Sequence, residues 1–159
     1  MTQDVLSDEP SGPPAIPVAA KWLGGLGVIP FVVCAAATLT APPILAAVAA
    51  LALLLYGAII LSFLGGIQWG LEIARNGRDG DAGVSFVRLT VSVIPALIGW
   101  CSLLLPREYG LVLLAVAFAC VLAVDLQAAR TGQAPAWYPK LRWPLTVTAI
   151  VTLLAGMLG

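Results

Sequence analysis

The fold is decided by the stretch WLGGLGVIPFVVCAAATLTAPPILAAVAALALLLYGAIILSFLGGIQWGL, which covers residues 22–71. These fifty consecutive residues include no Asp, Glu, Lys or Arg. One membrane-spanning helix needs about 20 apolar residues, so the stretch is long enough for two. It divides at Pro42 and Pro43, because proline has no backbone N–H and moves the residue before it out of helical geometry. We therefore expect transmembrane helices at about residues 22–40 and 44–71.

The composition of the whole chain also indicates an integral membrane protein. Hydrophobic residues make up 60% of the 159 residues and charged ones 10%. A soluble domain has about 25% charged residues. Three further apolar stretches predict spans at about residues 88–106, 109–127 and 143–159. The predicted fold is all-α, a polytopic membrane helix bundle with five transmembrane helices. We expect the acidic, proline-rich residues 1–20 to form a disordered cytoplasmic tail.

Positive charges predict how the helices are oriented. Arg107 is expected on the same side of the membrane as the C-terminus, and the other seven basic residues fall on the opposite side: Lys21, Arg75, Arg78, Arg88, Arg130, Lys140 and Arg142. Basic residues of short loops are retained in the cytoplasm. We therefore expect a bacterial inner membrane protein with a cytoplasmic N-terminus and a periplasmic or extracellular C-terminus. A mitochondrial inner membrane is the alternative.

Two features inside the spans predict irregular geometry. The second span is longer than the hydrocarbon core of about 30 Å requires, so we expect its ends to project into the interface, with Trp69 at the level of the lipid headgroups. Pro30 and Pro95 lie within the first and third spans. Each proline leaves a backbone carbonyl without its helical partner, and we expect a kink or local unwinding at both.

Several classes of function lack the residues they need. The chain has no histidine, which excludes a haem held by two histidines and histidine-based zinc sites. Its net charge is zero and it has no basic cluster, so we expect no nucleic-acid partner. Cys34, Cys101 and Cys120 lie far apart in apolar stretches, and we interpret them as small buried residues. No residue has the neighbours of a catalytic nucleophile, so we expect no enzyme activity, cofactor or metal.

Small residues recur along the second span. Ala58, Ser62, Gly66 and Gly70 are four residues apart and share one helical face. Such a face lets a neighbouring helix approach closely, so that dispersion contacts hold the two helices together. The main interpretation is helix packing within the chain. A contact with a partner subunit or a second copy and a substrate pathway are the alternatives.

Six polar residues in or beside the spans form the candidate polar or partner site: Tyr56, Gln68, Glu72, Arg88, Asp125 and Arg142. Two acids and two bases among them approach the same membrane surface from four different helices. Polar groups in lipid are unfavourable unless they are paired. The main interpretation is a set of interfacial ion pairs that anchor helix ends. A ligand or ion site and a partner-binding surface are the alternatives.

Three stretches carry a resemblance to a known family: residues 23–31 (LGGLGVIPF), 56–70 (YGAIILSFLGGIQWG) and 136–146 (AWYPKLRWPLT). The chain resembles the small integral membrane proteins known as transmembrane protein 69-like, or domain of unknown function 3429. The resemblance implies a five-span protein of bacterial inner membranes or of mitochondria, without an assigned activity. That family often has histidine at the position of Gln68, so a role of the histidine does not transfer to this chain.

These observations predict a non-enzymatic accessory, assembly or scaffold subunit that acts through helix–helix packing. The chain has close-packing faces and short loops, but no soluble domain and no cofactor ligands. The alternative is a small-solute transporter or permeation protein, oligomeric, with Tyr56, Gln68 and Glu72 along its path. The expected partners are the lipid bilayer and a membrane protein or a second copy of the chain.

Overall fold

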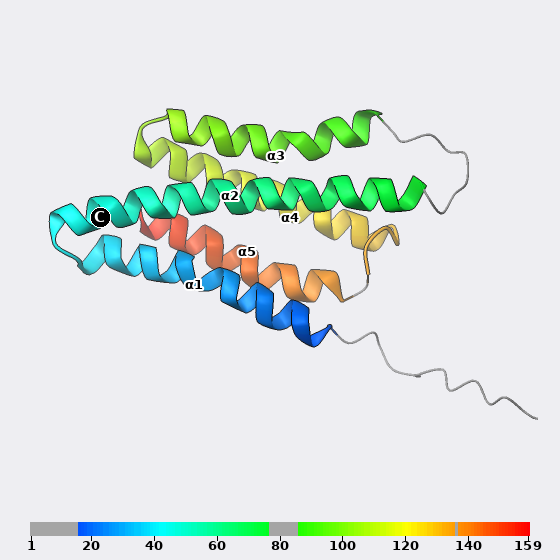
Figure 1. The fold of residues 1–159 in the computed structure, drawn as a ribbon, viewed down its shortest axis with the longest axis horizontal. Coiled ribbons are helices and arrows are strands. Elements are labelled where there is room, and N and C mark those ends of the chain that lie inside the picture. The colour runs from blue at the N-terminus through cyan, green and yellow to red at the C-terminus, as the bar shows by residue number, and fades with distance from the viewer. Residues whose placement is uncertain (1–15, 77–85, 136) are drawn as a thin grey trace, which may run out of the picture.

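The computed structural model describes residues 16–76, 86–135 and 137–159. Five helices follow one another along this part of the chain: α1 (Val18–Thr40), α2 (Pro43–Asn76), α3 (Phe86–Leu104), α4 (Arg107–Arg130) and α5 (Tyr138–Ala155). The prediction of an all-α bundle is confirmed, and no strand occurs in the three described ranges. Consecutive helices run in opposite directions (Figure 1).

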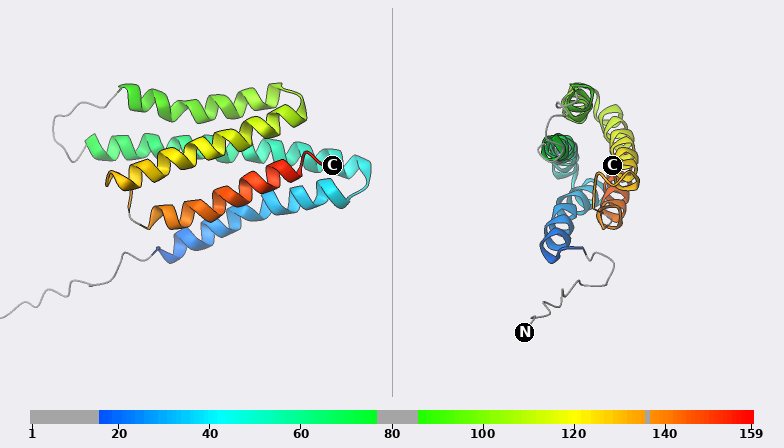
Figure 2. Two further views of the ribbon diagram at one scale, coloured as in Figure 1. Left: turned by 180° about the vertical axis from the view of Figure 1, so that it is seen from behind. Right: turned by 90° about the vertical axis from the view of Figure 1, so that its right-hand side faces the viewer.

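The helices form two layers. α3, α2 and α1 lie side by side in the first layer, and α4 and α5 form the second (Figure 2). α2 contacts each of the other helices, whereas α3 contacts α2 and α4 alone among the described elements. The long α2 is therefore the central helix of the bundle, and α3 lies at its edge.

One end of the bundle carries most of the positive charge. At this end, which we call the basic end, α1, α3 and α5 begin and α2 and α4 finish. Its basic residues in the described ranges are Lys21, Arg75, Arg88, Arg130, Lys140 and Arg142, whereas Arg107 lies at the opposite end. α2 has 34 residues and projects beyond α1 and α5 at the basic end (Figure 1), as its length predicted.

α5 differs from the other helices in composition. α1 to α4 are each long and apolar enough to cross a membrane, whereas α5 carries Lys140 and Arg142 near its start. It nevertheless covers the same height of the bundle as α1. Gly24, near the start of α1, packs against Leu145, and Gly159, just beyond α5, lies against Thr38 near the end of α1. α5 therefore runs alongside α1 from the basic end to the opposite end.

The first helix begins earlier than the composition predicted. α1 starts at Val18, so residues 18–20 are helical and the prediction of a disordered tail is wrong for them. Pro17 precedes the helix with a φ of −54°, and proline suits this position because a helix start has no use for its missing N–H. The rest of the predicted tail, residues 1–15, lies outside the described residues.

The two prolines expected to distort their spans lie within unbroken helix. α1 continues through Pro30 and α3 through Pro95, so the local unwinding expected at these positions does not occur. Pro95 is buried, and its ring lies beside Gly65 of α2. The tertiary contact thus accommodates the proline without a break in the helix.

The core fills the space between the two layers at the middle of the bundle. Its fully buried leucines come from α2, α4 and α5: Leu53, Leu61, Leu111, Leu114 and Leu153. Phe31 of α1 packs edge-on against Tyr56 and Phe118, with ring centroids 5.0 Å and 5.9 Å apart. These contacts join α1, α2 and α4.

Two of the three cysteines are more exposed than predicted. Cys101 and Cys120 are exposed and Cys34 is half-buried, so the interpretation as small buried residues is wrong for the first two. In a membrane the surroundings of the bundle are as apolar as its core, and a small apolar side chain is not driven to the inside.

Candidate functional site

The buried part of the candidate site is centred on Asp125 of α4, whose side chain is almost completely enclosed. Its carboxylate accepts a hydrogen bond of 2.7 Å from Nε of Arg142 on α5 and one of 2.5 Å from Nε2 of Gln68 on α2. Arg142 is buried as well. We call Gln68, Asp125 and Arg142 the Asp125 triad. It holds three helices together and neutralises two charges inside the bundle.

Burial makes the pairing in the triad necessary. An unpaired charge in a low-dielectric interior is strongly unfavourable, so each of the two ions depends on the other. A carboxylate offers acceptors alone, and the amide N–H₂ of Gln68 supplies the matching donor. The amide therefore occupies carboxylate lone pairs that Arg142 leaves, and the triad fixes how α2, α4 and α5 meet.

Further polar atoms surround the triad without well-formed hydrogen bonds. Within the described residues, Tyr138 Oη, Arg142 Nη2 and Thr146 Oγ1 are buried and have no such partner. Polar chemistry is thus concentrated where the start of α5 meets α4.

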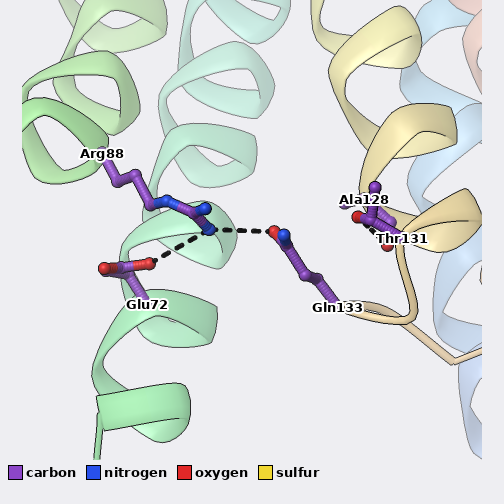
Figure 3. Close-up of polar contacts among 5 residues, drawn as sticks. All are labelled: Glu72, Arg88, Ala128, Thr131 and Gln133. Carbon is purple, nitrogen blue, oxygen red and sulfur yellow. Dashed lines mark hydrogen bonds and ion pairs between the residues drawn. The ribbon is translucent and has the colours of Figure 1, made fainter. Parts of the chain in front are cut away.

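The exposed part of the site is an ion pair between Glu72 of α2 and Arg88 of α3. Arg88 Nη1 lies 3.7 Å from Oε2 of Glu72 and donates a hydrogen bond of 3.1 Å to Oε1 of Gln133, in the turn after α4 (Figure 3). The side chain of Glu72 is 9% exposed and that of Arg88 is 43% exposed. We call Glu72, Arg88 and Gln133 the Arg88 bridge. It connects the first layer to the second at the basic end.

The end of α4 sets the position of Gln133. Thr131 Oγ1 donates to the carbonyl groups of Gln127 and Ala128, at 3.1 Å and 3.2 Å (the second is drawn in Figure 3). Gly132 then takes a positive φ of 72°, a conformation that favours glycine and commonly terminates helices. The chain therefore turns back, and the side chain of Gln133 reaches Arg88.

A cavity of about 710 Å³ lies between the Asp125 triad and the Arg88 bridge. α2, α3, α4 and the turn after α4 line it, and its polar lining residues are Gln68, Glu72, Arg88, Gln127, Thr131 and Gln133, together with Ser92. A cavity of this size can hold a small molecule or a lipid headgroup. No group of three or more potential metal ligands occurs among the described residues.

Tyr56 lies apart from the other predicted polar residues. Its hydroxyl donates a hydrogen bond of 2.8 Å to the carbonyl of Gly27 on α1, and its ring packs against Phe31. It does not line the cavity that Gln68 and Glu72 line. The three residues proposed for a solute path therefore do not lie along one cavity, and Tyr56 serves to join α1 to α2.

The predicted small-residue face of α2 is turned mostly away from the other helices. Ala58 is buried and packs against Gly99 of α3, but Ser62, Gly66 and Gly70 are exposed. A side chain added at Gly66 or Gly70 would meet nothing within 4 Å in the described structure. The interpretation as packing within the chain is therefore wrong for these three residues.

Helix packing uses a glycine one position away from the predicted face. At Gly65, the backbone carbonyl of Ser92 occupies the space that a side chain would need. Gly99 approaches α2 in the same way, where an added Cβ would lie 3.0 Å from the carbonyl oxygen of Ala58. These two glycines allow α2 and α3 to pack backbone against backbone.

Comparison with known proteins places the chain in a family. A family model described as "Protein of unknown function (DUF3429)" matches residues 16–158. The chain belongs to this family. The match covers all five helices, and it confirms the resemblance seen in the sequence.

Two curated relatives of this DUF3429 protein carry the name Transmembrane protein 69. The protein from Xenopus tropicalis is 34% identical over 150 residues, which cover 90% of this chain and 55% of that relative. The protein from Mus musculus is 25% identical over 149 residues, which cover 89% and 56%. The chain thus spans about half the length of the curated relatives it matches. No solved structure matches it.

The names of these relatives and the four long apolar helices both indicate that the chain is a membrane protein. Both relatives are eukaryotic, so the bacterial inner membrane and the orientation of the termini stay predictions.

Sequence reasoning missed several polar residues of this DUF3429 protein. Gln133 lies in a turn, where no helical periodicity indicates which way a side chain points. Thr131 and Gly132 gave the one available signal, since a polar residue followed by glycine commonly ends a helix. Tyr138 and Thr146 lie on α5 among apolar neighbours, and their burial depends on how α5 packs against α4.

Proposed function

We propose that the protein is a non-enzymatic accessory subunit of a membrane complex, and that it binds a partner membrane protein through the outer face of α2. This face consists of Ser62, Gly66 and Gly70. The observation that carries the proposal is the open space at the two glycines, where an added Cβ would meet nothing within 4 Å in the described structure.

Gly66 and Gly70 support this proposal because no contact within the described chain explains why these two positions are glycine. A glycine inside a helix lowers the stability of the helix by about 1 kcal/mol relative to alanine, so a helical glycine calls for a reason. Gly65 and Gly99 have one in the close contact of α2 with α3. Gly66 and Gly70 have no such contact within the described chain. In lipid, small residues let a second helix approach closely enough for dispersion contacts and weak hydrogen bonds.

Native mass spectrometry of the tagged chain, purified from its own membrane in mild detergent, tests the accessory role. We expect a heteromeric mass of defined stoichiometry. The variant Gly66→Leu should lose the partner and unfold at or above the temperature of the unmodified protein. Gly25→Leu is the matched control, because Gly25 of α1 is also exposed with nothing within 4 Å of an added Cβ.

Three results would overturn the accessory role. The first is a chain that runs alone as a monomer at every detergent concentration. The second is a Gly66→Leu variant that retains the partner as fully as Gly25→Leu does. The third is a homo-oligomer without any other protein, which would also favour the second candidate.

Solute transport is the second candidate, and the cavity of about 710 Å³ favours it. Against a path through one bundle, the interior beyond the cavity is filled by Leu53, Leu61 and Leu114, which are fully buried. A transport role therefore calls for a conformational change or an oligomer. Glu72→Ala in proteoliposomes should abolish uptake at unchanged abundance, and loss of abundance instead would assign Glu72 to packing.

We also propose that the basic end faces the cytoplasm, or the matrix in a mitochondrion. The described charges support this orientation, because six basic residues of the described ranges lie at this end and Arg107 at the other. In a background whose three native cysteines are replaced by serine, a membrane-impermeant maleimide applied to intact bacterial cells should label Arg107→Cys and leave Arg130→Cys unlabelled. The opposite pattern would reverse the orientation.

A further inference from the structure

Two hollows of the bundle adjoin each other and share part of their lining. The polar cavity at the basic end borders an apolar groove of about 180 Å³ between α3 and α4. Gln68, Val91 and Val124 line both of them. A single ligand can therefore place a polar part in the cavity and an apolar part in the groove.

The groove is suited to a hydrocarbon chain. Apart from Gln68, which also lines the cavity, every residue that lines the groove is apolar or a cysteine. These residues include Ile94, Pro95, Ile98, Leu113, Val116 and Cys120. Val116 is 56% exposed, so the groove is open to the outside of the bundle at a depth where the surroundings are lipid tails. α3 lies at the edge of the bundle and contacts α4 and α2 alone among the described helices, which leaves its groove with α4 uncovered.

The cavity is suited to an anion. Arg88 is much more exposed than Glu72, so the accessible charge of the Arg88 bridge is positive. Both contacts of Arg88 with the described residues use Nη1, and a guanidinium has five N–H donors. Gln127 and Thr131, which are exposed and line the cavity, add polar groups for further hydrogen bonds. Arginine binds phosphate through paired hydrogen bonds, which gives both affinity and a fixed geometry.

We infer that the two adjoining hollows together bind one anionic phospholipid of the bilayer, with its phosphate at Arg88 and one acyl chain in the groove between α3 and α4. The charge of Arg88 complements the phosphate, and the apolar lining of the groove complements the chain. This inference does not depend on the proposed partner, because Ser62, Gly66 and Gly70 line neither the cavity nor the groove.

The test is a titration of delipidated full-length protein in detergent, followed by native mass spectrometry. Phosphatidylglycerol provides both parts of the ligand, diacylglycerol the chains without the phosphate, and inorganic phosphate the anion without a chain. We expect one phosphatidylglycerol per protein, bound at least about tenfold more tightly than either of the other two, a ratio that corresponds to about one charge-assisted hydrogen bond.

Two pairs of variants locate the site. Arg88→Gln should weaken phosphatidylglycerol about tenfold and leave diacylglycerol unchanged, because one charge-assisted contact is lost. Arg130→Gln is its control, since Arg130 lies at the same end and lines neither hollow. Cys120→Trp fills the groove and should weaken both lipids. Cys101→Trp is its control, because Cys101 is also exposed and lies outside the groove.

Several outcomes would overturn the inference. Equal affinity for phosphatidylglycerol and diacylglycerol would remove the phosphate site. Inorganic phosphate bound as tightly as the lipid would assign the cavity to a soluble anion. Unchanged phosphatidylglycerol binding by Arg88→Gln would place the lipid elsewhere. The Arg88 side chain is half-exposed, so this variant should fold and still test the inference if Cys120→Trp does not fold. None of these outcomes bears on co-purification of a partner, so the two proposals fail separately.

Discussion

The inner and outer faces of α2 have different surroundings although both contain glycine. On the inner face, Gly65 lies against the backbone of α3, and Gln68 reaches Asp125. On the outer face, Gly66 and Gly70 are exposed, with open space in the described structure where a side chain would lie. Small residues thus show where a helix can approach α2, and they do not show whether that helix belongs to the same chain.

The largest effect is expected at Asp125, which accepts the hydrogen bond from Gln68 on the inner face of α2. Asp125→Ala leaves Arg142 buried without its counter-ion, and removal of one member of a buried pair destabilises by about 3–5 kcal/mol. The free energy of unfolding, measured by titration with SDS in mixed micelles, should fall by this amount. The double variant Asp125→Ala with Arg142→Leu should recover most of the loss, because no unpaired charge remains. Equal losses in the single and double variants would show that the two charges are not coupled.

A smaller effect is expected at Gln68. Gln68→Leu removes a hydrogen bond to a charged carboxylate, and such bonds contribute about 1.5–3 kcal/mol. Gln68→His retains an N–H donor, so most of the stability should remain. Thermal unfolding followed by circular dichroism compares the two variants. If both unfold at the same temperature, the hydrogen bond to Asp125 contributes nothing measurable.

The smallest effect is expected at the Arg88 bridge. Its ion pair is long and half-exposed, and pairs of this kind contribute about 0.2–1 kcal/mol. Arg88→Gln should therefore unfold within a few degrees of the unmodified protein, and Arg107→Gln, at the other end, provides the comparison. A loss as large as that of Asp125→Ala would mean that the bridge, like the triad, holds the fold together.

Much of the fold follows from the sequence, because the hydropathy of the bilayer interior acts on each helix separately. Uncharged stretches located α1 to α4, and Pro42 marked the turn between the first two. The charges of Glu72, Arg88 and Asp125 also indicated the end of the bundle at which the polar site lies. None of this information depends on which helices are neighbours.

The partners of the site residues could not be predicted in the same way. Residues 65 and 66 differ by about 100° around a helix, and a shift of one position separates the contact with α3 from the open outer face. A hydropathy pattern does not resolve this rotation when both faces are apolar. The bond from Gln68 to Asp125 likewise requires that α2 lie beside α4, an arrangement set by the packing of the whole bundle.

The most direct test of the distinction between the two faces compares the unfolding temperatures of Gly65→Leu and Gly66→Leu in the same detergent. Gly65→Leu should unfold at a clearly lower temperature, since overpacking a closed contact costs about 1–3 kcal/mol and the backbone of Ser92 cannot move aside like a side chain. Gly66→Leu should unfold at or above the temperature of the unmodified protein. Equal losses in the two variants, or a larger loss in Gly66→Leu, would contradict the assignment of Gly65 to the inside and Gly66 to a partner.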